Sequence, residues 1–245
     1  MSNNTALTEL RIDGAELTSL DVSKNTALTQ LYCGGNKLTS LDVSNNTELR
    51  YLQCYWNKIT ILKVSNNTAL INLDCSANQL TSLDVTNNTV LKELKVWQNQ
   101  LTSLDVSKNV ALEWLIADNN KLTSLDVTNN IHITNLGCYD NQLTSLDLSQ
   151  NTKLKVLYAS ENQLTSLNMR NGVKESLTTF VIHTNPSLTC IEVLDPAWAT
   201  ANWVSVSGGN IEMDAGVTFT YICGVDVDGV STYNNNGIKA ITFNV

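Results

Sequence analysis

Several residue types are scarce in this 245-residue chain, and each scarcity excludes a class of function. Lysine and arginine number 15 against 23 acidic residues, which gives a net charge of −8. The chain therefore lacks the basic surface that nucleic acid binding requires. No apolar run approaches the ~20 residues of a membrane span, and the first residues, which contain no apolar segment, do not resemble a signal peptide.

Catalytic and metal-binding motifs are also missing. Only two histidines occur, His132 and His183, and neither has a nucleophile or a second ligand at a recognisable spacing. There is no phosphate-binding loop and no zinc motif. The segment 226–229 resembles only the start of a calcium loop, because the later ligands do not follow. We therefore expect no enzyme, no cofactor and no bound metal.

Leucine and asparagine, by contrast, recur every 21 residues over eight copies. The pattern is Leu-x-x-Leu-x-(apolar)-x-x-Asn-x-Leu, which is the leucine-rich repeat signature and predicts a solenoid. The leucine columns begin at Leu7, Leu10 and Leu20, and the asparagine column begins at Asn36. The period breaks once, by two residues, within 171–176, and then resumes from Leu177.

The alternation around the second leucine is typical of a strand, and identical strands one repeat apart can only pair in parallel. The asparagine suits a buried turn whose open backbone groups its amide can satisfy. We expect a right-handed superhelix with a parallel β-sheet on its concave face, an extended or turn-like convex side and almost no helix. About nine repeats would fill residues 1–193. A small β-rich cap would fill 194–245, with strands near 217–222 and 238–245. Because the chain begins in repeat phase, we expect it to be a fragment of a longer protein.

The repeat at 28–46, Leu28-Thr-Gln-Leu-Tyr-Cys-Gly-Gly-Asn-Lys-Leu-Thr-Ser-Leu-Asp-Val-Ser-Asn-Asn46, resembles the cysteine-bearing bacterial repeats of the internalin J type, the IRREKO class. This resemblance covers residues 3 to about 193. It implies a secreted or cell-surface module for adhesion or recognition. The segment 188–193, with Trp198 and Trp203, resembles the end of repeat arrays on surface proteins of Bacteroidetes-type bacteria. The chain has no wall anchor or sorting domain, so surface attachment rests on the resemblance alone.

The six cysteines fall into two sets. The first set occupies one inward strand position: Cys33, Cys54, Cys75 and Cys138. Other repeats place Val96 and Ala117 there, so we expect buried, reduced thiols that pack as small apolar groups. The alternative is a metal or redox ladder. Cys190 and Cys223 lie outside this position, and the export that the resemblance implies favours a disulfide between them over two further buried thiols.

An aspartate column on the return segment also invites two interpretations. It comprises Asp21, Asp42, Asp84, Asp105, Asp126 and Asp147. A calcium ladder is conceivable because carboxylates suit hard cations. Two repeats replace the aspartate with Lys63 and Asn168, however, and this favours capping of the backbone on a solvated face.

Every tyrosine and tryptophan before the cap falls at a strand position that should face the concave side or its rim. These residues are Tyr32, Tyr51, Tyr55, Trp56, Trp97, Trp114, Tyr139 and Tyr158. Seven acidic residues share the face with only Arg11 and Lys95; they are Glu9, Asp13, Asp74, Glu93, Asp118, Asp140 and Glu161. Aromatic side chains dominate binding hot spots, although cross-strand stacking could also explain them.

We therefore predict a non-enzymatic, monomeric extracellular module that binds a protein partner through an aromatic, acidic concave face. A glycan-binding module is the first alternative, because tryptophan and tyrosine also stack on sugar rings. A passive spacer in a larger surface protein is the second. Protein binding predicts hot spots spread over several repeats, whereas glycan binding predicts a local cluster.

Overall fold

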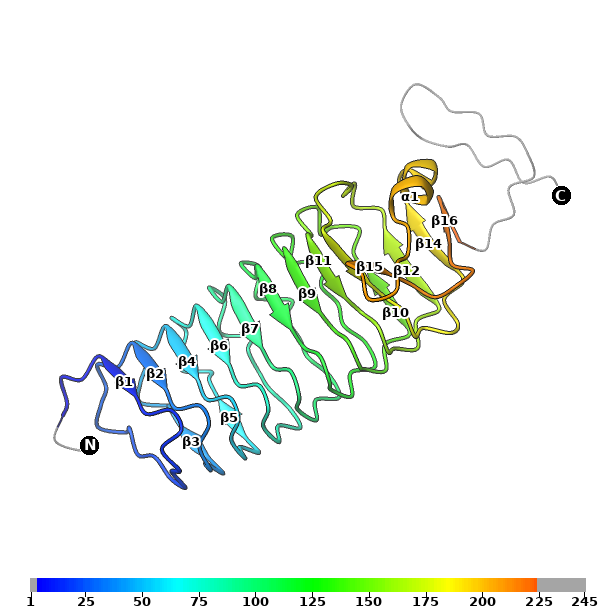
Figure 1. The fold of residues 1–245 in the computed structure, drawn as a ribbon. Helices are drawn as coiled ribbons and strands as arrows, with labels where there is room; N and C mark the ends of the chain where they lie inside the picture. The colour runs from blue at the N-terminus through cyan, green and yellow to red at the C-terminus, as the bar shows by residue number, and fades with distance from the viewer. Residues whose placement is uncertain (1–3, 224–245) are drawn as a thin grey trace.

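The computed structural model describes residues 4–223 and shows a solenoid whose turns add one strand each to a continuous parallel sheet (Figure 1). Ten strands form this sheet, in the order β1 (Glu9–Arg11), β2 (Gln30–Tyr32), β4 (Tyr51–Gln53), β6 (Asn72–Asp74), β7 (Glu93–Lys95), β8 (Trp114–Ile116), β9 (Asn135–Gly137), β11 (Val156–Tyr158), β13 (Thr179–Val181) and β15 (Ile211–Glu212). The first nine come from the repeats. The tenth comes from the region predicted as a cap.

The central residue of each strand points into the core. Leu10 pairs with Leu31, and this pairing continues in steps of 21 residues until Leu157 pairs with Phe180. The last step spans 23 residues because the loop at 171–176 is longer. The central leucines from Leu31 to Leu157 are fully buried, and each contributes about 1.5–3 kcal/mol to stability. Each repeat is thus buried by its two neighbours rather than by a separate layer.

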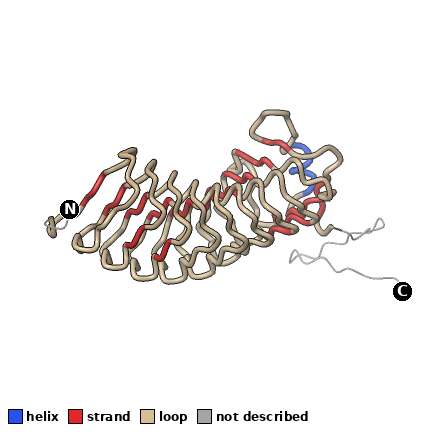
Figure 2. Tube along the Cα trace, turned by 90° about the horizontal axis from the view of Figure 1, so that it is seen from below, coloured by secondary structure: helices blue, strands red, loops and turns tan. Residues whose placement is uncertain are grey.

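The chain returns along the opposite side mostly in turns, which Figure 2 shows as long stretches of loop between short strands. A four-stranded parallel sheet lies there, made of β10 (Ser145–Asp147), β12 (Ser166–Met169), β14 (Cys190–Val193) and β16 (Thr218–Thr220). A two-stranded sheet pairs β3 (Leu41–Asp42) with β5 (Leu62–Lys63). Alternating leucine and valine on these segments close the core from that side.

Two columns of asparagine tie successive turns together. In the predicted column, Asn99 donates from Nδ2 to the carbonyls of Cys75 and Val96 at 3.1 and 3.0 Å, and its Oδ1 accepts the Leu80 N–H at 3.0 Å. A second column donates from Nδ2 to two carbonyls of the preceding repeat; it comprises Asn46, Asn67, Asn88, Asn109, Asn130 and Asn151. We did not predict the second column, although its spacing is equally regular in the sequence.

The region after residue 193 continues both sheets. β15 pairs in parallel with β13, and β16 pairs in parallel with β14. β16 falls within the strand predicted at 217–222. The strand predicted at 238–245 and the calcium-like segment 226–229 lie outside the described residues. In the described part of the chain, no helix has the length and apolarity needed to cross a membrane.

A short helix, α1 (Pro196–Asn202), covers this end of the solenoid. Asp195 caps it by accepting the Trp198 N–H at 3.1 Å, and Pro196 stands in the first turn, where a missing N–H costs nothing. Trp203 follows the helix and packs against the rings of Phe180 and Phe219, with centroids 5.1 and 5.6 Å away. The sequence pattern predicted a β-rich cap and did not reveal this helix.

Candidate binding face

The outward side of the ten-stranded sheet, called the sheet face below, carries four rows of side chains. Counting from the central residue of each strand, the leading row is the residue before it and the middle row the residue after it. The trailing row is the third residue after it, and the turn row is the fourth. The backbone ladder continues past the strands into these last two rows, for example from the Ala77 N–H to the Trp97 carbonyl at 2.8 Å. All four rows therefore run along the solenoid axis.

The turn row adopts a left-handed backbone conformation in every repeat. Its members are Gly14, Gly35, Trp56, Ala77, Gln98, Asn119, Asp140, Glu161 and Thr184, with φ between 49° and 64°. This conformation is uncommon for residues other than glycine and unfavourable for a bulky one. Trp56 nevertheless occupies it with 59% of its surface exposed. A large aromatic side chain in a strained, solvent-facing turn is a candidate for function.

The structure separates the eight predicted aromatic residues into four environments. Tyr51 and Trp114 lie in the leading row, Tyr32 and Tyr158 in the middle row, and Tyr55, Trp97 and Tyr139 in the trailing row, while Trp56 stands alone in the turn row. The exposure expected for Tyr32 is wrong. Tyr32 is only 8% exposed, because the Arg11 guanidinium covers its ring at 3.9 Å from the centroid, and its hydroxyl donates to Gln30.

A recess of about 270 Å³ lies between Tyr51 and Trp114. The two rings, 36% and 44% exposed, belong to β4 and β8 and are separated by β6 and β7. The floor is polar, since Asn72 donates from Nδ2 to Glu93 Oε2 at 2.5 Å and Lys95 pairs with Glu93 at 2.5 Å. We call this recess the slot. Tyr51 and Trp114 were predicted for the face, but their pairing across two polar strands was not.

A second recess, of about 530 Å³, adjoins the slot at the edge of the sheet. Ile71 and Lys92 line both recesses, and Arg50 and Val90 line the outer one. Lys92 pairs with Glu113 at 2.9 Å, beside the slot. None of these residues was predicted as a site residue. The repeat spacing could have identified them, because each of the lining residues Arg50, Ile71, Lys92 and Glu113 directly precedes a leading-row residue in the sequence.

Carboxylates dominate the charge of the sheet face. Its two basic residues pair with its own glutamates, Arg11 with Glu9 and Lys95 with Glu93, each at 2.5 Å. Among residues 4–223, no cationic partner is found for five carboxylates of the face: Asp13, Asp74, Asp118, Asp140 and Glu161. Burial raises the pKa of Asp118 to about 6, although the Tyr139 N–H donates to it at 2.8 Å.

Comparison with solved structures places this architecture among known folds. Internalin C2 of Listeria monocytogenes is 18% identical, covers 78% of this chain and 83% of its own, and gives a TM-score of 0.63. A leucine-rich repeat protein of Leptospira interrogans is 23% identical over 79% of this chain and 57% of its own, with a TM-score of 0.60. The chain has an internalin-like leucine-rich repeat fold.

The functional domain of InlJ from Listeria monocytogenes, described as including a cysteine ladder, is 30% identical to this leucine-rich repeat chain. It covers 79% of this chain and 56% of its own, with a TM-score of 0.45. The chain therefore spans little more than half the length of this domain and of the Leptospira protein. No protein-family model matches the chain, and no curated protein matches it.

The cysteines of the leucine-rich repeats are free thiols in the core. Cys33, Cys54, Cys75 and Cys138 are each 0% exposed, and burial raises the pKa of all four, that of Cys33 to about 12. Within residues 4–223 no cluster of three or more histidine, cysteine or acidic residues could hold a metal ion. The structure joins Cys190 to Cys223 in a disulfide, with the Cα atoms 6.0 Å apart, which ties the last repeat to the end of the described chain.

The aspartate column of the return segments caps the backbone. Asp105 Oδ1 accepts the N–H of Ser107 at 2.9 Å, and the other five aspartates of the column accept the N–H two residues later in the same way. Hydrogen bonds from that residue lower the pKa of Asp105. Each of these carboxylates is thus engaged by the backbone of its own turn.

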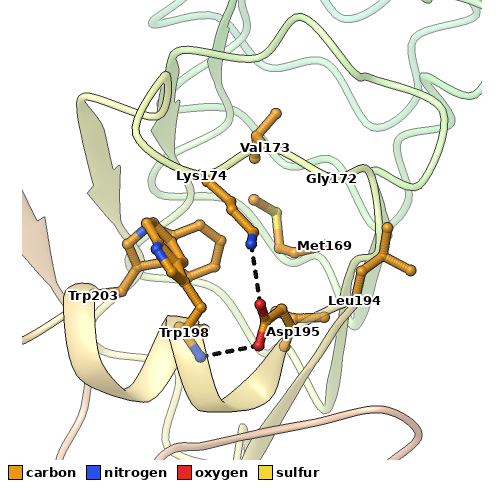
Figure 3. Close-up of a pocket in the computed structure, with 10 residues that line it drawn as sticks. Met169, Gly172, Val173, Lys174, Leu194, Asp195, Trp198 and Trp203 are labelled. Carbon is orange, nitrogen blue, oxygen red and sulfur yellow. Dashed lines mark hydrogen bonds and ion pairs between the residues drawn. The ribbon is translucent and has the colours of Figure 1, made fainter.

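A small cavity of about 20 Å³ lies where the long loop meets α1 (Figure 3). Lys174 extends from that loop to Asp195 at 3.0 Å and lies 5.4 Å from the Trp198 ring centroid. A volume of this size holds no more than a water molecule. These contacts fix the loop to the cap.

Proposed function

We propose that this chain is a non-enzymatic, extracellular or cell-surface recognition module that binds a protein partner through the sheet face. The observation that supports this most directly is the slot between Tyr51 and Trp114. Both rings are partly exposed and flank a polar floor, so the slot combines aromatic contact area, of the kind enriched at binding hot spots, with hydrogen-bonding groups. The internalin-like repeats and their likeness to bacterial surface arrays support the location. We further propose that the chain is monomeric.

The dimensions of the slot favour a projecting element of a folded protein. Tyr51 and Trp114 are three strand spacings apart, which corresponds to about 14 Å. Subtracting about 3.5 Å for the thickness of an aromatic contact leaves an opening of at most about 11 Å between the two side chains. An α-helix with its side chains is about 10–12 Å across. We propose that a helix or a tight hairpin of the partner enters the slot.

The charge of the sheet face favours a basic partner. In the described part of the chain, five carboxylates of the face have no cationic partner, and its arginine and lysine are already paired with glutamates. Complementary charge steers association and makes its rate depend on salt. Binding should therefore weaken as salt rises, mainly through a slower association rate.

Trp114→Ala tests the proposal, with Tyr158→Ala as the matched control. Both residues are 44% exposed on the same face, but Tyr158 lies outside the slot. Immobilised parent protein and both variants would be exposed to surface-protein extracts of host or neighbouring cells, beside a glycan array. We expect at least one protein to be captured by the parent and by Tyr158→Ala, and at least tenfold less by Trp114→Ala.

Circular dichroism must first show that each variant keeps its fold. Equal capture by the parent and by Trp114→Ala would rule out the slot as the anchor. A passive spacer would give no specific capture by any of the three proteins.

A further inference from the structure

Large and small side chains alternate along the trailing row. The aromatic members are Tyr55, Trp97 and Tyr139, each 42 residues from the next. The positions between and beside them hold Gly34, Ser76, Asp118 and Ser160. The aromatic residues follow β4, β7 and β9, which are alternate strands of the sheet, while β6 and β8 precede the small or acidic residues; Figure 1 shows the order of these strands. No other row of the sheet face shows this alternation.

The alternation lets an aromatic ring lie down over its small neighbour. A methyl group built on Gly34 would meet three ring carbons of Tyr55 at 2.6, 2.7 and 2.9 Å. Ring carbons, and not the terminal hydroxyl, are the nearest atoms, so the ring lies over Gly34 by its flat side. Ser76, between Tyr55 and Trp97, is 0% exposed, and Ser160, beyond Tyr139, is buried as well. The small residues are covered, and the aromatic residues form the surface.

The aromatic residues of this row are evenly spaced in a straight line. Two strand spacings separate one from the next, which is about 10 Å, so the line from Tyr55 to Tyr139 is about 20 Å long. A linear β-1,4-linked polysaccharide presents sugar rings at a fixed interval along a line, because successive sugars are flipped and every second ring shows the same face, at a repeat close to this interval.

We propose that Tyr55, Trp97 and Tyr139 form a binding strip for a linear β-1,4-linked polysaccharide that is uncharged or carries amino groups. The axial C–H groups of a pyranose ring carry partial positive charge and suit the negative face of an aromatic ring. The strip is flanked by carboxylates at Asp118, Asp140 and Glu161, which can accept hydrogen bonds from hydroxyl or amino groups. The same carboxylates disfavour polyuronates through like-charge repulsion.

This site is separate from the slot. The strip occupies the trailing row and the slot the leading row of the same strands, on opposite sides of the central leucines. The proposal therefore does not depend on the protein-binding function, and each site supplies the control for the other. Trp97 is the middle member of the strip, while Trp114 belongs only to the slot.

Isothermal titration with defined hexasaccharides tests the strip. The probes are cellohexaose, fully deacetylated chitohexaose and β-1,4-linked hexaglucuronate, which share the chain length and the linkage and differ in charge. We expect at least one of the first two to bind, and hexaglucuronate to bind at least tenfold more weakly than that probe. Trp97→Ala should weaken binding at least tenfold, whereas Trp114→Ala should change it by less than twofold.

Chain length provides a measurement that needs no variant. A trisaccharide reaches two aromatic residues of the strip, and about five sugars are needed to reach all three at this spacing. We expect the hexasaccharide to bind at least tenfold more tightly than its trisaccharide. Trp97→Phe, which keeps an aromatic ring, should restore most of the affinity lost in Trp97→Ala.

Four results would overturn the proposal. They are no binding of cellohexaose or deacetylated chitohexaose to the parent, preferred binding of hexaglucuronate, undiminished binding by folded Trp97→Ala, and equal affinity for tri- and hexasaccharide. A further outcome is that no glycan binds and that Trp97→Ala loses as much protein capture as Trp114→Ala. Both rows would then belong to one protein interface. That outcome would refute the strip and leave the slot in place.

Discussion

Asn99→Ala should be among the most destabilising single changes outside the leucine core. The Leu80 N–H, which belongs to a fully buried residue, donates to Asn99 Oδ1 at 3.0 Å, and no other acceptor for it occurs among the described residues. A buried donor left unsatisfied costs about 1–3 kcal/mol, and the bonds from Nδ2 to Cys75 and Val96 add about 1 kcal/mol each. The free energy of unfolding should therefore fall by about 3–5 kcal/mol.

Asn109→Ala is the matched control from the second asparagine column. Its Nδ2 donates to the carbonyls of Val85 and Asn88 at 2.9 Å each, and both carbonyls keep a backbone donor when the amide is removed. No donor reaches Asn109 Oδ1 within residues 4–223. The same substitution therefore leaves no new buried group unsatisfied and should cost only about 1–2 kcal/mol.

Urea unfolding followed by tryptophan fluorescence would measure both variants, and hydrogen exchange would report on the Leu80 amide. We expect the Leu80 amide to lose protection in Asn99→Ala beyond what the global loss of stability explains. Repeat arrays can unfold in steps, so coincidence of fluorescence and circular dichroism must be checked first. Equal destabilisation by the two variants would show that the unsatisfied Leu80 donor contributes little to the loss of stability.

Three further changes test the core, the buried acid and the cysteines. Leu94→Ala should cost about 2–5 kcal/mol through lost burial and a cavity, and an unchanged urea midpoint would refute the register described above. Burial raises the pKa of the Asp118 carboxyl group from 3.8 to about 6. Asp118→Asn removes this carboxyl group and keeps an acceptor for the Tyr139 N–H. The folded state therefore binds more protons between these values, and the stability of the parent falls as pH rises through that window. The variant should gain about 1–3 kcal/mol at pH 7 and almost nothing near pH 4, and an equal gain at both would contradict this account. The four core cysteines should not react with an aromatic disulfide reagent in the native protein at pH 8, because burial disfavours their thiolates. They should react after unfolding. Rapid labelling of the native protein would refute their burial.

The sequence was sufficient to predict the architecture because a solenoid stacks identical units in register. A side chain at one position of a repeat packs against the same position of the next, so columns in the sequence become rows in space. The pairing of Leu10 with Leu31 and the burial of Cys54 both follow from this rule. The role of Asn99 follows too, because a regular turn leaves the same backbone groups open in every repeat.

The tertiary structure decided everything that depends on unlike neighbours. Tyr32 and Tyr158 share one row, yet Tyr32 is covered by Arg11 while Tyr158 is exposed. The slot exists because two polar strands separate Tyr51 from Trp114. The sequence pattern also did not predict the tenth strand or α1, because the region after residue 193 contains no repeat that would set its register. The repeat period determines the backbone position from which a side chain projects. The size and charge of the neighbouring side chains determine its orientation and how much of its surface is exposed to a partner.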